Sequence, residues 1–188
     1  GHGAFFRTRV VNDWVGRVLG VMTLTPYDVW RRAHALHHTT NGNLDRRGIG
    51  DIETITVREY HARPWFGRLA YRLYRHPAIM FGLGPAYLFF LKHRLPFGMM
   101  HEGWRPWISS LATNAAIALA VTGMMALVGA FPFLLIQLPI MLLAASIGVW
   151  LFYVQHQFET TLWTREGAWN LQEAALYDEI AARTGAPP

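Results

Sequence analysis

The chain has 188 residues, of which 52% are hydrophobic and only 15% are charged, a composition more apolar than that of a soluble domain. It contains no cysteine, which excludes a disulfide framework, a cysteine-based zinc site and an iron–sulfur cluster. The formal net charge is +5. Long apolar segments directly follow the basic stretch, so we expect a membrane surface, and no nucleic acid, as the anionic partner.

The most informative motif is an H-x-x-H-H cluster formed by His34, His37 and His38. Residues 10–29, a mixed apolar segment, are predicted to form a helix that leads into it. On a helix these three positions share one face, and neutral imidazoles suit Zn, Cu, Fe and Ni. The alternative is a polar helix that happens to be rich in histidine, but three unpaired imidazoles packed together would cost stability. The cluster therefore predicts a metal site.

Three segments follow the cluster before the long apolar ones. Residues 40–51 carry glycine and Asp/Arg turn signals and are predicted to form a loop. Residues 60–75 alternate aromatic residues with arginines, as an amphipathic helix lying on a membrane surface does. Residues 78–91 are apolar but too short to span a bilayer, and Gly82, Gly84 and Pro85 interrupt them. We expect this stretch to lie at the membrane interface or to re-enter it.

Two uncharged segments, residues 108–128 and 131–154, are long enough to cross a bilayer. About 21 residues at ~1.5 Å each cover the ~30 Å hydrocarbon core. Gly129 and Ala130, with Pro132, leave room only for a tight turn, so we expect a transmembrane hairpin at about residues 108–154. The alternative is a pair of buried helices in a soluble bundle.

The distribution of basic residues predicts the orientation of this hairpin. Most Arg and Lys residues lie between Arg31 and Arg105, whereas the turn of the hairpin holds none, so the positive-inside rule places the basic segment in the cytoplasm. The two ends of the hairpin return to that same side. The predicted fold class is an all-α, integral membrane helical protein with a cytoplasmic, histidine-rich helical cap. This topology gathers five candidate metal ligands, which are His2, His34, His37, His38 and His156.

The residues between and around the histidines limit which kinds of metal chemistry this site is expected to perform. A zinc hydrolase would normally place a carboxylate base between its ligands, as in H-E-x-x-H, but here Ala35 and Leu36 stand between the histidines. A b-type haem would need two histidines that face each other across a bundle. A multi-histidine iron site at a membrane surface suits the activation of O2 against an apolar substrate.

Four segments carry a resemblance to membrane fatty acid desaturases of the bacterial acyl-lipid type. Residues 1–6 (GHGAFF) resemble the end of the first histidine box, and residues 30–40 (WRRAHALHHTT) resemble the second box. Residues 42–51 (GNLDRRGIGD) are similar to the continuation found in bacterial acyl-lipid members. Residues 152–159 (FYVQHQFE) resemble the segment after a transmembrane hairpin whose histidine is a further iron ligand. The match runs from residue 1 to about residue 176.

The resemblance implies a non-haem di-iron oxidoreductase that uses O2 and two electrons to introduce a cis double bond into a fatty acyl chain. The electrons would come from ferredoxin or a cytochrome b5-type donor, and the acyl chain would be carried by a lipid or a thioester. The resemblance implies that the five histidines are ligands of the two irons, as an incomplete set within this chain, and that no catalytic residue is needed beyond the metal ligands. Candidate hydrogen-bond partners of the ligands are Asp45, Asp51 and Glu159, for which the alternative is a solvated loop carboxylate.

The implied location is the inner membrane of a bacterium, with the histidine boxes on the cytoplasmic face.

The sequence departs from the family pattern in two places, and each departure leaves expected metal ligands out of this chain. The first box in the family is H-x-x-x-H, so its first histidine would precede Gly1. A third box, another H-x-x-H-H, is expected after residue 176, but residues 177–188 contain no histidine. We therefore expect an internal fragment or a truncated product, with a partial desaturase domain over residues 1–176 and a polar tail over residues 177–188.

Two alternatives to a desaturase stay open. The first is a fatty acyl or carotenoid hydroxylase or ketolase of the same histidine-box class, although the run from Asn43 to Arg47 leans toward a desaturase. The second is a non-catalytic, truncated membrane protein.

Overall fold

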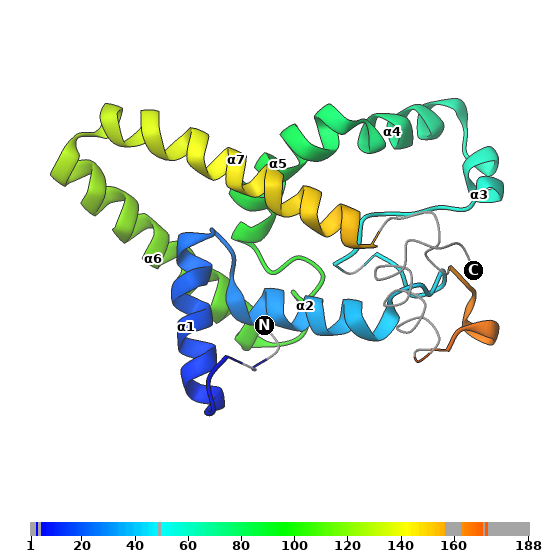
Figure 1. Cartoon of the computed structure of the whole chain (residues 1–188), viewed down its shortest axis with the longest axis horizontal. Coiled ribbons are helices and arrows are strands. Elements are labelled where there is room, and N and C mark those ends of the chain that lie inside the picture. The colour runs from blue at the N-terminus through cyan, green and yellow to red at the C-terminus, as the bar shows by residue number, and fades with distance from the viewer. Residues whose placement is uncertain (1–2, 4, 49, 157–162, 171, 173–188) are drawn as a thin grey trace. The chain divides into compact units, whose positions relative to one another are not determined.

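The computed structural model describes residues 3, 5–48, 50–156, 163–170 and 172, and this part of the chain is helical (Figure 1). Its only strand-like pairing within those ranges is an isolated bridge between Asn43 and Thr164. The all-α prediction is confirmed for these residues. The elements are α1 (Arg9–Met22), α2 (Tyr27–Thr40), α3 (Val57–Ala62), α4 (Trp65–Arg75), η1 (Ile79–Leu83), α5 (Gly84–Phe90), η2 (Lys92–Arg94), α6 (Trp104–Val128), α7 (Ala130–His156) and η3 (Glu166–Ala168).

The contacts divide the chain into two compact units. The first comprises Gly1–Arg32 and Phe81–Ile147, and the second comprises Ala33–Met80 and Gly148–Pro188. The boundaries fall inside α2 and α7, so the first turns of α2 belong to the first unit and the histidine cluster belongs to the second.

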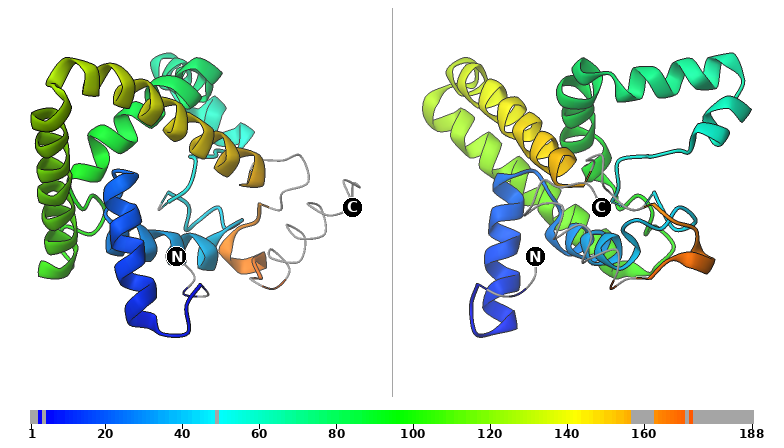
Figure 2. Two further views of the ribbon diagram at one scale, coloured as in Figure 1. Left: turned by 60° about the vertical axis from the view of Figure 1, so that its left-hand side comes forward. Right: turned by 45° about the vertical axis from the view of Figure 1, so that its right-hand side comes forward.

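In the first unit, α1 packs against α6, and η2 packs against α5 and α6 (Figure 2). Arg94 of η2 is a polar anchor in this unit. Its guanidinium donates to Asn114 Oδ1 of α6 (2.8 Å) and to the carbonyl of Leu24, while Asn114 Nδ2 donates back to the Arg94 carbonyl (2.8 Å). One side chain therefore holds the turn after α1 against α6.

The prediction of one continuous helix over residues 10–29 is wrong, because the structure divides this segment between α1 and α2. Leu24 adopts a left-handed φ of 55°, and the amide of Thr25 donates to the Gly20 carbonyl (2.7 Å), which closes the end of α1. Pro26 then explains the break, since a proline disfavours helical backbone at the residue before it and has no N–H to donate.

Two helices, α6 and α7, are long and apolar enough to cross a membrane, and only Gly129, with a φ of 89°, separates them. Their most apolar stretches are almost entirely exposed, with Leu119, Leu127 and Phe131 at 75%, 80% and 76%. Core helices of a soluble bundle would bury such side chains, so exposure favours the membrane hairpin over that alternative. Residues 78–91 form the two short elements η1 and α5, as their interrupted sequence indicates.

The second unit contains the end of α2, the loop after it, α3, α4, the end of α7 and η3. The amphipathic helix predicted over residues 60–75 is two helices, because Pro64 ends α3 and begins α4 (Figure 2). A capping box starts α3. Thr56 accepts from the Glu59 amide (3.2 Å), and Glu59 accepts from the Thr56 amide (2.8 Å).

Glu59 also accepts a hydrogen bond from Arg47 Nη2 at 2.6 Å. This bond, together with that from the Thr56 amide, lowers the pKa of Glu59 from 4.5 to about 2. The charged carboxylate therefore joins the loop after α2 to the first turn of α3.

We predict a pH-dependent contribution of Glu59 to stability. Because its folded pKa lies below its unfolded pKa, the contribution is complete above pH 4.5 and is lost as the pH falls through about 2. Glu59→Gln should lower the free energy of unfolding by about 1 kcal/mol at neutral pH. Thermal unfolding followed by circular dichroism in detergent micelles checks this. The midpoints of the two proteins should converge toward acid pH, and a constant difference would contradict the assignment.

Candidate functional site

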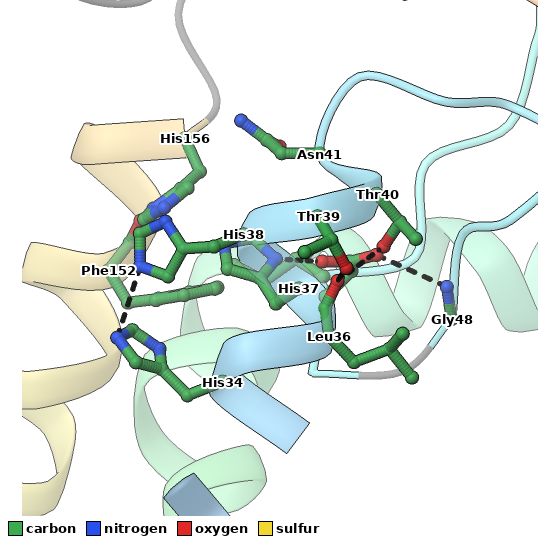
Figure 3. A network of polar contacts seen from close by, with 12 residues as sticks. His34, Leu36, His37, His38, Thr39, Thr40, Asn41, Gly48, Phe152 and His156 are labelled. Atoms are coloured by element: carbon green, nitrogen blue, oxygen red, sulfur yellow. Dashed lines mark hydrogen bonds and ion pairs between the residues drawn. The ribbon is translucent and has the colours of Figure 1, made fainter. Parts of the chain in front are cut away.

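The histidine cluster lies on α2, as its spacing predicts. The ring centroids of His34 and His38 are 4.5 Å apart, and those of His37 and His38 are 5.5 Å apart. Figure 3 shows the three side chains along one side of α2, facing the end of α7. The cluster is therefore a single group of imidazoles within the second unit.

His37 is the buried member, with only 2% of its surface exposed. Its Nδ1 lies within hydrogen-bonding distance of Asp51 Oδ1, and the other carboxylate oxygen of Asp51 accepts from the Gly48 amide (3.3 Å). A carboxylate can only accept, so the proton belongs on Nδ1 and the lone pair on Nε2. Nε2 is buried and has no hydrogen-bond partner among the residues that the structure describes. A buried, unpaired lone pair of this kind is costly unless something binds it.

Gly50 lets the loop approach α2 closely enough for this contact. Its φ is +79°, and a Cβ built there would lie 3.3 Å from the Ala33 carbonyl oxygen and 3.4 Å from the His37 Cβ. Both the backbone conformation and the space favour glycine. Asp51, the next residue, is thereby presented to His37.

His156, the last residue of α7, lies beside His37, with ring centroids 4.7 Å apart. Its Nδ1 lies 2.8 Å from the Phe152 carbonyl oxygen, one helical turn earlier. Because a carbonyl can only accept, Nδ1 carries the proton and Nε2 carries the lone pair. The Phe152 ring stacks on His156 at 4.3 Å and lies 5.3 Å from the His37 ring. Two histidines from distant parts of the sequence are thus packed together with defined tautomers.

His34 and His38 form a second pair. Their Nε2 atoms are 3.1 Å apart, as the dashed line between them in Figure 3 shows. Two nitrogens bound to one first-row metal ion lie roughly 3.0–3.4 Å apart, because each metal–nitrogen bond is ~2.1 Å long. Across the ranges that the structure describes, no three histidine or acidic side chains converge closely enough to form a complete metal site. The described histidines instead lie in two pairs, His37 with His156 and His34 with His38, and each pair offers two nitrogen atoms to a metal ion.

The three carboxylates predicted to support the ligands have different positions. Asp51 contacts His37, whereas Asp45 accepts from Arg165 Nη1 (2.7 Å) and from the Glu166 amide (3.0 Å). Asp45 therefore joins the loop after α2 to the segment before η3. Glu159 lies outside the described residues, as do His2 and the tail over residues 177–188.

Sequence reasoning missed three residues that shape this site. Gly50 allows the approach of the loop, Phe152 fixes His156, and Asn43 is completely buried. The Asn43 side chain donates to Glu166 Oε2 (2.8 Å) and accepts from the Asp45 amide (2.9 Å). Spacing could have revealed Phe152, which stands four residues before a candidate ligand, but the other two roles depend on contacts through space.

Comparisons with known proteins agree with the resemblance seen in the sequence. The family model described as fatty acid desaturase matches residues 1–181. A fatty acid desaturase of Bacillus subtilis is 43% identical over 175 residues, which cover 93% of this chain and 49% of that protein. The chain belongs to the fatty acid desaturase family. Its family membership is therefore confirmed.

Relatives with lower sequence identity to this chain are also named as desaturases. An sn-1 acyl-lipid omega-3 desaturase (ferredoxin) of Synechocystis is 33% identical over 47% of the chain and 23% of that protein. A Delta(12) fatty acid desaturase of Mortierella isabellina is 24% identical over 94% of the chain and 51% of that protein. The chain spans about half the length, or less, of these relatives. No solved structure matches it.

We predict that the hydrogen bond from His37 to Asp51 stabilises the second unit. Asp51→Ala leaves the buried Nδ1 without an acceptor and should lower the free energy of unfolding by about 1–3 kcal/mol. Urea unfolding in detergent micelles, followed by circular dichroism, measures the change. Glu53→Ala is the matched control, since it removes only the more exposed ion pair with Arg63 and should cost about 0–1 kcal/mol. Equal losses in the two variants would contradict a special role for Asp51.

Proposed function

We propose that this chain is part of a membrane fatty acid desaturase, which introduces a cis double bond into a fatty acyl chain with O2 and two electrons. Family membership supports the reaction class. The observation that carries the proposal is the buried Nε2 of His37, which no described residue pairs with although Asp51 holds the ring. A ferredoxin or a cytochrome b5-type protein is the proposed electron donor, and a lipid-linked or thioester-linked acyl chain is the proposed substrate.

The imidazole nitrogens of these histidines suit the binding of iron. Desaturases of this family are generally iron-dependent, and imidazole nitrogen is a good ligand for iron. His37 and His156 each have Nδ1 at hydrogen-bonding distance from an oxygen, so in the neutral rings the proton lies on Nδ1 and the Nε2 lone pair can bind a metal ion. The 3.1 Å between the Nε2 atoms of His34 and His38 is compatible with two ligands of one ion.

We assign His34, His37, His38 and His156 to the holding of two non-haem irons, with His2 as a further ligand. When bound, the irons would supply the redox chemistry with O2. The role of the residues around them is to orient the ligands. Asp51 fixes the ring of His37, and the Phe152 carbonyl fixes the ring of His156. The Phe152 ring, packed against both histidines, limits the access of water to that side.

We place the protein in a bacterial inner membrane, with these histidines at the cytoplasmic face. The two apolar helices supply the membrane spans. The orientation of these spans follows from the positive-inside rule. Basic residues are concentrated between Arg31 and Arg105, whereas the turn at Gly129 is uncharged.

Replacement of His37 tests the reaction. Expressed from its complete reading frame in a bacterial host without desaturases, the wild type should yield unsaturated fatty acids, measured as methyl esters by gas chromatography and mass spectrometry. His37→Ala should reduce them to background, because a ligand is lost. His37→Asn places an amide nitrogen where Nδ1 stands, so it can still donate to Asp51 and should also be inactive while preserving the fold. The control is His61→Ala on the exposed surface of α3, which should keep the wild-type level.

Other outcomes of this experiment would contradict the proposal. Unsaturated product from both His37 variants would remove His37 from the site. Hydroxylated or keto products from the wild type would instead assign the chain to the related hydroxylases or ketolases.

Metal binding tests the role of Asp51 separately from activity. Asp51→Asn replaces the carboxylate that accepts the Nδ1–H hydrogen bond of His37, and loss of such a partner of a metal ligand should lower metal affinity by roughly 10–100-fold. The probe is Co²⁺ titrated into the purified protein in detergent and followed by its visible absorption. Asp45→Asn is the control, because Asp45 contacts Arg165 and not a histidine. Equal affinities in both variants would exclude Asp51 from a supporting role.

A further inference from the structure

Helix α4 presents an apolar side that nothing within the described residues covers. Trp65 and Phe66 are 71% and 61% exposed, and Leu69 and Leu73 are also exposed. At 100° per residue, these four positions fall within about one third of the helix circumference. Such a stripe of large apolar side chains on an exposed helix indicates a surface that binds something apolar.

Arginines lie beside this apolar side. Arg68, Arg72 and Arg75 recur at intervals of three and four residues and so share the adjacent side of α4, which contains no acidic residue. The Arg72 guanidinium lies over the Tyr60 ring, at 5.9 Å from its centroid. The partner of this surface should therefore be both apolar and anionic, as the headgroup region of an acidic lipid leaflet is.

The position of α4 within the second unit favours a membrane over a protein. Arg75 lies over the ring of Tyr153, with 5.5 Å between the guanidinium carbon and the ring centroid. Tyr153 stands near the end of α7, where an apolar helix able to span a membrane finishes. Tyrosines at such ends lie at the membrane–water interface. The C-terminal end of α4 is therefore held at that level.

The third side of α4 holds the loop that carries Asp51. The Tyr74 hydroxyl accepts from the Glu53 amide (3.0 Å), and the Tyr71 hydroxyl donates to the Glu53 carbonyl (3.5 Å). Glu53 Oε1 accepts from Arg63 Nη2 (2.8 Å), and Arg63 follows the last residue of α3, two residues before α4 begins. Glu53 stands only two residues after Asp51, so α4 and the His37–Asp51 pair share one short loop.

We propose that α4 is an in-plane anchor for an anionic lipid surface and that its docking steadies the loop that presents Asp51 to His37. Trp65, Phe66, Leu69 and Leu73 enter the boundary between headgroups and acyl chains, while Arg68 and Arg72 contact lipid phosphates. The tyrosines transmit this restraint to Glu53. The link to His37 rests on the proposed function of that residue, whereas the lipid contact does not.

Lipid contact is tested in the full chain, reconstituted in nanodiscs of phosphatidylcholine with or without phosphatidylglycerol. The native chain has no cysteine, so Leu69→Cys can carry a single environment-sensitive fluorophore. We expect lipids with a doxyl quencher near the headgroup to quench this label, and more strongly in the anionic discs. His61→Cys on α3 is the matched control and should remain unquenched. Adding Arg68→Gln and Arg72→Gln should remove the difference between the two lipid compositions.

Two results would overturn the lipid contact. A label at residue 69 that is accessible to water and unquenched shows that α4 does not enter the membrane. A label that is shielded from water yet unquenched by lipid shows that α4 contacts a protein instead. Equal quenching in both kinds of disc would refute the preference for anionic lipid.

The link to Asp51 is tested by amide hydrogen exchange over residues 50–56 in the same discs. Exchange should be slower in anionic discs than in neutral ones. Tyr74→Phe removes the acceptor of the Glu53 amide, so exchange there should rise about fivefold, while lipid quenching at residue 69 stays unchanged. Identical exchange in all these samples would refute the link. Neither readout depends on metal or activity, so failure of the desaturase assignment and failure of this proposal are distinguishable.

Discussion

A buried imidazole held by a buried carboxylate is the interaction around which the second unit is organised. His37 lies inside the unit, and burial of a polar ring is tolerable only when its nitrogens are satisfied. Asp51 satisfies one nitrogen from a loop that has to fold back onto α2. Other contacts restrain the same loop at both ends. Asn43 and Asp45 tie its beginning to the segment before η3, and Glu53 ties its end to α4.

The buried residues in the described part of the chain include several polar side chains and few large apolar ones. Its completely buried side chains include Asn43 and Ser110, whereas most large apolar side chains on α6 and α7 face outward. A lipid environment explains this inversion, because apolar side chains gain nothing by leaving hydrocarbon, while polar groups require partners within the protein. Hydrogen bonds such as those between Arg94 and Asn114 therefore position elements that a soluble protein would hold by hydrophobic packing.

Much of the architecture was predictable because it depends on local patterns. The spacing of His34, His37 and His38 placed them on one side of α2, and the absence of charge over about 20 residues identified α6 and α7. The break between α1 and α2 was missed because the apolar pattern continues through it. Pro26 was the available signal, but the left-handed turn at Leu24 has no signature in its side chain.

The supporting carboxylate of the site could not be chosen from the sequence. Asp45 and Asp51 lie in the same loop, six residues apart, and each was an equally good candidate. Only the path of the backbone distinguishes them, since it turns Asp45 toward Arg165 and Asp51 toward His37. Phe152 acts through its main-chain carbonyl, a group that every residue has, so its identity did not indicate this role.

The close approach at Gly50 bears on how variants of this protein should be interpreted. A search that checks only histidines and carboxylates would count a chain with alanine at position 50 as intact. Its added methyl group would nevertheless meet the Ala33 carbonyl and the Cβ of His37, in a backbone conformation that favours glycine. Surveys of natural sequences and libraries of designed variants should therefore treat this glycine as part of the site, although it contributes no side chain to it.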